Sequence, residues 1–222
     1  MQYILHSYRR CPFCIRTRIL VYLKNIPYEI IEEPLRVWTP WMHAWSLKTG
    51  EQPRVPILRY MDENGTEHTI PESNTINLLI DTFDNKTNYT PELKSDAYRE
   101  METWWKWCDE VLKPMIDRYK YGAHLKFDTT VHAVHTAELK KLVQVLEDTL
   151  CDKEFLIEAR LTLADIAIIP FIRQIMRTRE GEFDFTPYPR VYQWTECLIK
   201  TDWFQNEVMK RTCVSAHRMH IS

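Results

Sequence analysis

Short stretches of alternating apolar and polar residues occupy the first third of the chain, and helical spacing dominates the rest. Residues 2–6 alternate, and from Pro12 to about Lys24 the apolar residues follow the spacing of a helix. Tyr28–Glu32 has the pattern of a second strand. The order strand, helix, strand favours parallel pairing through a right-handed crossover. Arg16 and Arg18 lie between the apolar positions of the helix, and we expect them to face solvent.

A hairpin follows this β-α-β pattern. A short helix is predicted over residues 39–48, before two strands at Ile57–Tyr60 and Glu67–Ile70. The strands flank Asp62-Glu63-Asn64-Gly65, whose Asn-Gly pair is typical of a tight hairpin turn. Ser73 precedes further apolar residues at helical spacing, and we expect it to be the N-cap of that helix.

The remainder of the chain predicts helices only. One long helix is expected from Leu93 to about Tyr121, with a kink or break at Pro114. Its predicted core stripe is Met101, Trp104, Trp105, Cys108, Val111, Leu112 and Met115. Further helices are expected at about residues 130–151, 162–176, 188–200 and 202–210. The predicted apolar set of the first of these is Val131, Val134, Leu139, Leu142, Val145, Leu146 and Leu150.

The helix at 162–176 is apolar on all sides, which is typical of a helix in the middle of its domain. Thr162 and Asp165 stand at its start as a capping box, with Asp165 in place of the usual Glu or Gln. The fold class that follows is α/β plus all-α. We expect an α/β domain over about residues 1–84 and an all-helical domain over about residues 90–222, joined by the polar segment 84–91.

Composition narrows the class of protein. The chain has 222 residues, of which 45% are hydrophobic and 27% charged, and its formal net charge is -2. A net charge this small gives no bulk reason to expect nucleic acid as a partner. No apolar run is long enough to span a membrane, and the first residues lack the pattern of a secretory signal. Six cysteines at irregular spacing fit a reducing compartment, so we expect a cytoplasmic protein.

The main candidate for chemistry is Cys11-Pro12-Phe13-Cys14. Pro12 suits the first position of a helix, which places Cys11 at the N-cap. The free N–H groups and the dipole of the helix then favour a thiolate at Cys11, and Arg9 and Arg10 add positive charge. Cys14 lies one turn later in more apolar surroundings. We therefore expect Cys11 to be the nucleophile and Cys14 the resolving thiol of a thiol-disulfide exchange.

A metal site is the alternative interpretation of these cysteines. Two of them could form half of a zinc site, but the other four are scattered singly, so we expect no metal. The pair His132 and His135 lacks a third ligand, and we expect these two side chains to be solvated. The trio Cys213, His217 and His220 is expected to lie in a frayed tail. The four scattered cysteines, to which the sequence assigns no role, are Cys108, Cys151, Cys197 and Cys213.

Two further motifs suggest a binding site for a peptide-like molecule. Val55-Pro56 stands directly before a strand and is a candidate for a cis peptide bond, which would leave the backbone of Val55 available to an extended ligand. Glu72 and Ser73 stand at a helix start. There a carboxylate and free N–H groups can receive the ammonium and the carboxylate of an α-amino acid head group.

These motifs, in this order of elements, resemble the thioredoxin-fold domain of glutaredoxins and cytosolic glutathione transferases. The likeness is strongest to two-domain bacterial glutaredoxins with a glutathione-transferase fold, and thiol transferases of the omega class are a close second. The resemblance implies that Pro56 is cis and that Phe13, Val55, Glu72 and Ser73 hold glutathione. It also implies an N-terminal thioredoxin-fold domain, a C-terminal helical bundle, and a structural role for Thr162 and Asp165.

The function that the resemblance implies is a glutathione-dependent thiol-disulfide oxidoreductase. Cys11 would reduce glutathione mixed disulfides, and Cys14 would serve when the target is a protein disulfide. The expected co-substrate is glutathione, and the expected partners are glutathionylated or disulfide-containing proteins, with no nucleic acid and no membrane; the chain would be a monomer or homodimer. The alternatives are an omega-like transferase or dehydroascorbate reductase, and a non-catalytic binding protein with this fold.

Overall fold

The computed structural model describes residues 2–83, 87–122, 129–178, 182–210 and 214–215. The chain divides into two compact units. The first comprises Met1–Thr87 together with Asp202–Ser222, and the second comprises Asn88–Thr201. This division differs from the predicted one, because the segment from Asp202 onward belongs to the first unit and not to the helical one. No helix among the described residues is long and apolar enough to cross a membrane.

The first unit is built on a mixed sheet with the strand order β4-β3-β1-β2-β5. Strand β1 pairs in parallel with β2 across the connection through α1, and pairs antiparallel with β3, which continues into a hairpin with β4. The prediction of a β-α-β unit followed by a hairpin is confirmed. The bounds are β1 Tyr3–Ser7, α1 Pro12–Leu23, β2 Tyr28–Glu32, β3 Ile57–Met61 and β4 Glu67–Pro71.

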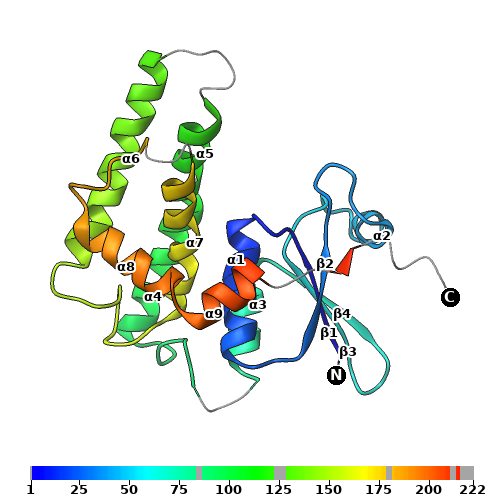
Figure 1. Cartoon of the computed structure of the whole chain (residues 1–222). Helices are drawn as coiled ribbons and strands as arrows, with labels where there is room; N and C mark the ends of the chain where they lie inside the picture. The colour runs from blue at the N-terminus through cyan, green and yellow to red at the C-terminus, as the bar shows by residue number, and fades with distance from the viewer. Residues whose placement is uncertain (1, 84–86, 123–128, 179–181, 211–213, 216–222) are drawn as a thin grey trace. The chain divides into compact units, whose positions relative to one another are not determined.

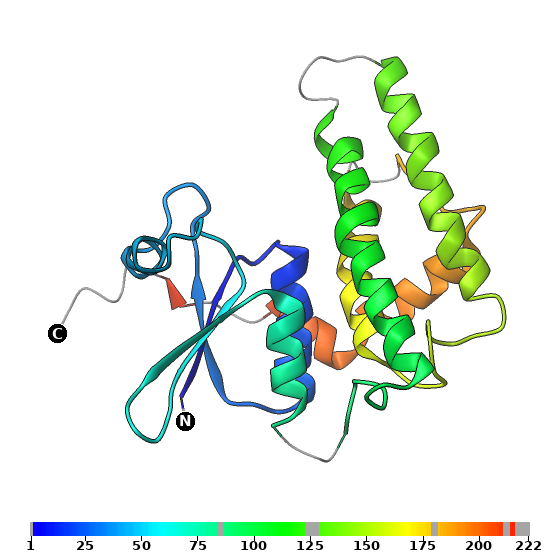
Figure 2. The same ribbon diagram turned by 180° about the vertical axis from the view of Figure 1, so that it is seen from behind.

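Helices cover both faces of this sheet (Figures 1 and 2). Helices α1 and α3 (Ser73–Asp81) pack together on one face, and α2 (Pro40–Thr49) lies on the other. Under α2, Met42 and Trp45 form a buried cluster with Ile57 of β3. The apolar positions that gave the sequence its strand and helix patterns are therefore the ones that fill the two cores of this unit.

The expectation that Arg16 and Arg18 face solvent is wrong, because both side chains are fully buried. The Arg18 guanidinium donates to the Glu207 backbone oxygen, and its Nε lies 3.4 Å from a Glu207 carboxylate oxygen. The Tyr28 hydroxyl donates to the same carboxylate. These contacts hold the C-terminal segment in the first unit.

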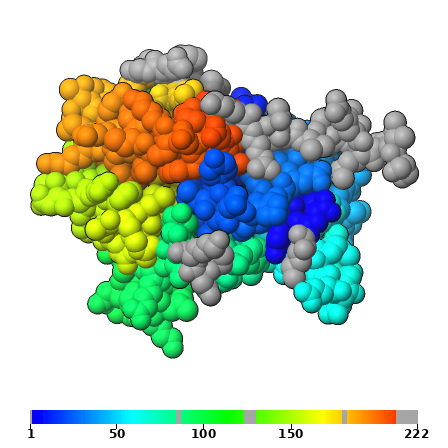
Figure 3. Space-filling model, turned by 60° about the horizontal axis from the view of Figure 1, so that its bottom comes forward, coloured from blue at the N-terminus to red at the C-terminus, as the bar shows by residue number. Residues whose placement is uncertain are grey.

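That C-terminal segment was predicted as one helix over residues 202–210. It consists instead of a short helix α9 (Asp202–Phe204) and a π-helical segment η3 (Gln205–Lys210), both packed on α1. Figure 3 shows its red-orange atoms against the blue of the first unit. Strand β5 (Val214–Ser215) then joins the sheet in parallel with β2. Val214 and Ser215 therefore belong to the sheet and not to a frayed tail.

In the second unit, the long helix predicted over residues 93–121 is divided into three parts. They are α4 (Asp96–Trp107), the π-helical turn η1 (Cys108–Leu112) and α5 (Lys113–Tyr121). Pro114 has no N–H and its ring crowds the preceding turn, so the irregularity falls directly before it. Because the π turn shifts the register of the faces, Val111 is 44% exposed although the α-helical stripe placed it in the core.

The other helices of this unit are α6 (Thr129–Thr149), α7 (Leu163–Arg177) and α8 (Pro189–Ile199). Helix α7 is buried over most of its length and packs on α4, α5 and α8, which confirms its predicted central place (Figures 1 and 2). The apolar set predicted for α6 is wrong at Val131, Val134 and Val145, which are exposed. The residues that α6 and its end bury in this core are Leu139, Val143, Leu146 and Leu150.

Candidate functional site

Cys11 lies where the structure leaves β1 and enters α1. It is the N-cap residue of α1, with an extended backbone, and Pro12 occupies the first turn, as the sequence predicts. The backbone N–H of Cys11 donates to the Tyr8 oxygen at 3.0 Å, and the Cys11 oxygen accepts from the Ile15 N–H at 3.0 Å. The residue is partly exposed. Its thiol is thus held at the positive end of a 12-residue helix.

Cys14 lies on the same helix in a different environment, because its side chain is fully buried. Its sulfur accepts a hydrogen bond from the Tyr8 N–H at 3.3 Å. Burial raises the pKa of the Cys14 thiol well above its usual value, and the neighbouring Cys11 raises it further. Cys14 therefore stays protonated at neutral pH, whereas Cys11 is the thiol that a reactant can approach.

A cavity of about 210 Å³ lies beside the start of α1, and its lining is drawn from three places in the sequence. Phe13 comes from α1, Val55 and Pro56 from the loop before β3, and Glu72 and Ser73 from the start of α3. The Val55-Pro56 peptide bond is cis, as expected. All four residues proposed from the sequence to hold a ligand are brought together here, next to the structural Pro56; Cys11 is not in the lining.

Arg54 is the sixth residue of that lining, and the sequence analysis did not select it. Its guanidinium lies 3.2 Å from a Glu72 carboxylate oxygen and also pairs with Glu51. Arg54 directly precedes Val55-Pro56, so its place next to a ligand-binding motif was the signal that could have selected it. The cavity therefore carries charges of both signs, as a zwitterionic head group requires.

The start of α3 differs by one residue from the prediction. Glu72, and not Ser73, is the N-cap, and Ser73 is the first helical residue. Glu72 has φ 71°, a left-handed conformation that costs a residue with a side chain about 1–3 kcal/mol. The Glu72 side chain is 61% exposed, so its carboxylate is accessible, whereas Ser73 is almost fully buried.

Arg16 is a further residue of this site that the sequence analysis missed, because it predicted a solvated side chain. The Arg16 guanidinium lies over the Phe13 ring, with 4.9 Å from its carbon to the ring centroid. It donates to Ser73 Oγ at 3.4 Å and to Asn74 Oδ1 at 3.2 Å. Since the Ser73 oxygen accepts from Arg16, the Ser73 hydroxyl proton can be donated elsewhere. Arg16 thus links the aromatic wall of the cavity to the start of α3.

Thr162 and Asp165 form the predicted capping box at the start of α7. One Asp165 oxygen accepts from the Thr162 N–H at 2.9 Å and from its hydroxyl at 2.8 Å, and the other accepts from the Leu156 N–H at 2.9 Å. Burial raises the pKa of Asp165 to about 6. These contacts fix a loop onto a helix start, which is a structural role.

The described residues contain no group of three or more His, Cys, Asp and Glu side chains that could hold a metal ion. His132 is not a solvated side chain as expected: its Nε2 lies 2.5 Å from a Glu182 oxygen and its ring stacks on Tyr119. The trio Cys213, His217 and His220 lies outside the described residues. Of the scattered cysteines, Cys108 is buried, whereas Cys151 and Cys197 are exposed.

Comparison with known proteins gives matches to both parts of the chain. Residues 5–88 match the family model of the glutathione S-transferase N-terminal domain, and residues 114–202 match that of the C-terminal domain. Glutathione S-transferase U2 of Arabidopsis thaliana is 26% identical over 221 residues, which cover 95% of this chain and 87% of the relative.

Solved structures share the fold at lower identity. A glutathione transferase family member from Pseudomonas fluorescens, solved with two glutathione molecules bound, superposes with a TM-score of 0.79 at 19% identity. That match covers 93% of this chain and 92% of the other. Glutathione transferase URE2P8 from Phanerochaete chrysosporium, solved with oxidized glutathione, gives 0.78 at 18% identity and covers 95% of this chain and 98% of the other.

Proposed function

Because the chain belongs to the glutathione transferase superfamily, we propose that it is a glutathione-dependent thiol-disulfide oxidoreductase of the glutaredoxin type. The observation that carries this proposal is the inequality of its two thiols. Cys11 is partly exposed at the start of α1, and Cys14 is buried one turn later with a raised pKa. An accessible thiol that attacks and a protonated thiol that resolves the adduct are the two roles in the reduction of a protein disulfide.

Glutathione binds in the cavity beside Phe13 in this proposal. The backbone of Val55 pairs with the tripeptide backbone, and Glu72 receives the γ-glutamyl ammonium. The γ-glutamyl carboxylate accepts hydrogen bonds from the Ser73 hydroxyl and from backbone N–H groups at the start of α3. Arg54, whose guanidinium already pairs with Glu72, adds a cation to the same wall. This placement leaves the glutathione sulfur free to extend toward Cys11.

The reaction proceeds in two exchanges. The Cys11 thiolate attacks the glutathione sulfur of a mixed disulfide; a bond between Cys11 and glutathione forms, and the target thiolate leaves and takes up a proton. A second glutathione thiolate then attacks the glutathione sulfur of this adduct, which releases glutathione disulfide and returns Cys11 to its thiolate. With a protein disulfide as target, the Cys11 thiolate attacks one sulfur, and the other sulfur of the target leaves as a thiolate and takes up a proton. The Cys14 sulfur then attacks Cys11 Sγ, and the second target thiolate leaves with the Cys14 proton. Two glutathione molecules reduce the resulting Cys11–Cys14 disulfide and become glutathione disulfide.

The experiment that tests this function is the turnover of a glutathionylated peptide with glutathione as reductant. Cys11→Ser should abolish turnover, and Cys14→Ala should retain it while losing activity on a protein disulfide. Cys108→Ala is the matched control, because Cys108 is also fully buried and lies in the other unit. If the folded wild-type protein binds glutathione but turns over neither substrate, the chain is a binding protein and the oxidoreductase proposal fails.

Conjugation of glutathione to an electrophile is the second candidate function, and the name of the Arabidopsis relative favours it. A hydroxyl would then have to activate the glutathione thiol. The Ser7 side chain is fully buried, and the Tyr8 hydroxyl accepts from Arg10 Nε at 3.0 Å. Activity of Cys11→Ser on an aryl halide, together with loss of that activity in Tyr8→Phe, would support this second function against the first.

A further inference from the structure

A second cavity lies entirely within the helical unit, between the end of α6 and one side of α8. Its volume is about 350 Å³, within the range of pockets that hold small molecules. Two exposed free cysteines, Cys151 and Cys197, both line it. Neither thiol has a part in the function proposed above, so this pair of cysteines on one cavity is unexplained.

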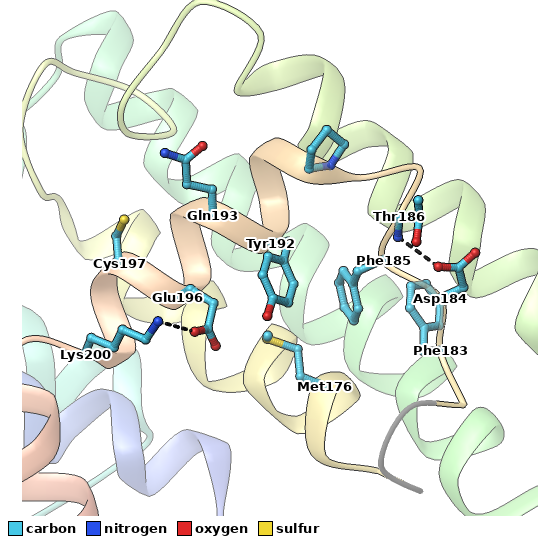
Figure 4. A pocket seen from close by; sticks show the side chains of 11 residues that line it. Met176, Phe183, Asp184, Phe185, Thr186, Tyr192, Gln193, Glu196, Cys197 and Lys200 are labelled. Atoms are coloured by element: carbon cyan, nitrogen blue, oxygen red, sulfur yellow. Dashed lines mark hydrogen bonds and ion pairs between the residues drawn. The ribbon is translucent and has the colours of Figure 1, made fainter.

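Cys197 also lines a larger cavity, of about 1080 Å³, that lies along α8. Figure 4 shows that cavity, with the Cys197 sulfur on the side of Gln193 and away from the rings of Phe185 and Tyr192. Gln193 is the other α8 residue that both cavities share. The sulfur and the Gln193 amide lie four residues apart, so they stand on one face of the helix.

The lining of the smaller cavity carries charges of both signs, which suits a zwitterionic peptide. Lys153 and Arg190 line it as cations and Glu154 as an anion. The Arg190 guanidinium also lies 3.3 Å from a carboxylate oxygen of the buried Glu147, but its side chain is 48% exposed and can meet a second carboxylate. Trp194, three residues before Cys197, is 7% exposed, and its Nε1–H has no hydrogen-bond partner among the described residues. A ligand with carboxylates and amide oxygens would match these cations and could accept from the indole and from Gln193.

We propose that this cavity is a second thiol site, which takes a glutathionyl group in disulfide linkage to Cys197. The Cys197 thiolate attacks one sulfur of glutathione disulfide. A bond forms between Cys197 Sγ and that sulfur, the disulfide bond of glutathione disulfide breaks, and the departing glutathione thiolate takes up a proton. Cys197 is thereby oxidised and one glutathione sulfur is reduced. The glutathionyl group carries two carboxylates and one ammonium, which can pair with Lys153, Arg190 and Glu154 of the lining as charges of opposite sign.

The test uses the full-length Cys11→Ser variant, so that no adduct on Cys11 contributes. The reduced protein is exposed to glutathione disulfide, the remaining thiols are alkylated, and the adducts are located by peptide mass spectrometry. We expect the glutathionyl group on Cys197. Its adduct should form faster than the adduct on Cys151, although both cysteines are exposed. Lys153→Glu should slow adduct formation about threefold, the scale of a surface charge interaction. Lys141→Glu, exposed on α6 and outside the cavity, should not.

A neutral disulfide serves as a control, because it reports the reactivity of the Cys197 thiol without any charge for the cavity to bind. Hydroxyethyl disulfide should modify Cys197 at the same rate in the Lys153→Glu variant and in its parent. The proposal is overturned if glutathione disulfide leaves Cys197 unmodified, if Cys151 reacts as fast as Cys197, or if Lys153→Glu slows both disulfides equally. Since Cys11 is absent from the assay, failure here leaves the oxidoreductase proposal intact.

Discussion

The buried carboxyl of Asp165 should make the stability of this protein depend on pH in a way that one substitution removes. Its pKa is raised from 3.8 to about 6 because the group is buried. The folded state therefore holds this proton more tightly than the unfolded state does. The resulting stabilisation is fully present below about pH 3.8 and is lost as the pH rises through about 6.

The size of this effect follows from the shift. A difference of about 2 pKa units corresponds to about 3 kcal/mol of unfolding free energy, and about 2 kcal/mol of it falls between about pH 4.5 and about pH 7.5. Asp165→Asn cannot ionise, so this component disappears. The amide also leaves either the Thr162 or the Leu156 N–H without its acceptor, which should lower stability by about 1–3 kcal/mol.

Urea unfolding followed by circular dichroism, at several pH values, measures both effects. The unfolding free energy of wild type minus that of Asp165→Asn should decrease as the pH rises. Asp96→Asn is the matched control, because Asp96 lies in the first turn of α4 with its carboxylate exposed. The reasoning is refuted if the difference between wild type and Asp165→Asn is the same at every pH, or if Asp96→Asn changes the pH dependence as much.

Two further predictions follow from burial. In native protein, iodoacetamide should alkylate Cys151 readily and leave Cys14 unmodified until denaturant is added. The reason is that Cys14 is fully buried and its pKa is raised. Peptide mass spectrometry that finds Cys14 alkylated rapidly in the native protein would contradict this. Glu207→Gln should lower the unfolding free energy by about 3–5 kcal/mol in urea titrations, since it leaves the buried Arg18 charge without its carboxylate. Glu138→Gln, whose partner is exposed, should change it by less than about 1 kcal/mol, and equal losses would refute the argument.

The sequence by itself determined the strands and helices of residues 3–81 and the motif residues that line the candidate site, but not Arg16 or Arg54. Alternation and helical spacing are local properties, and they gave β1, α1, β2 and the hairpin nearly to the residue. The motif residues Phe13, Val55-Pro56 and Glu72-Ser73 are separated in sequence, yet each stands at an element boundary. The resemblance to the thioredoxin-fold domain implied that these residues share one ligand site, and the structure brings them to one cavity.

Only the tertiary structure decided what covers each face. Helical spacing places Arg16 and Arg18 between apolar positions, but it does not identify their partners. Arg16 donates to Ser73 and Asn74, and Arg18 donates to Glu207. The contact between Arg18 and Glu207 joins residues 189 positions apart, and it also brings the segment from Asp202 into the first unit. Local pattern cannot encode such a pairing, because burial of a charge becomes favourable only when a distant partner supplies the opposite charge.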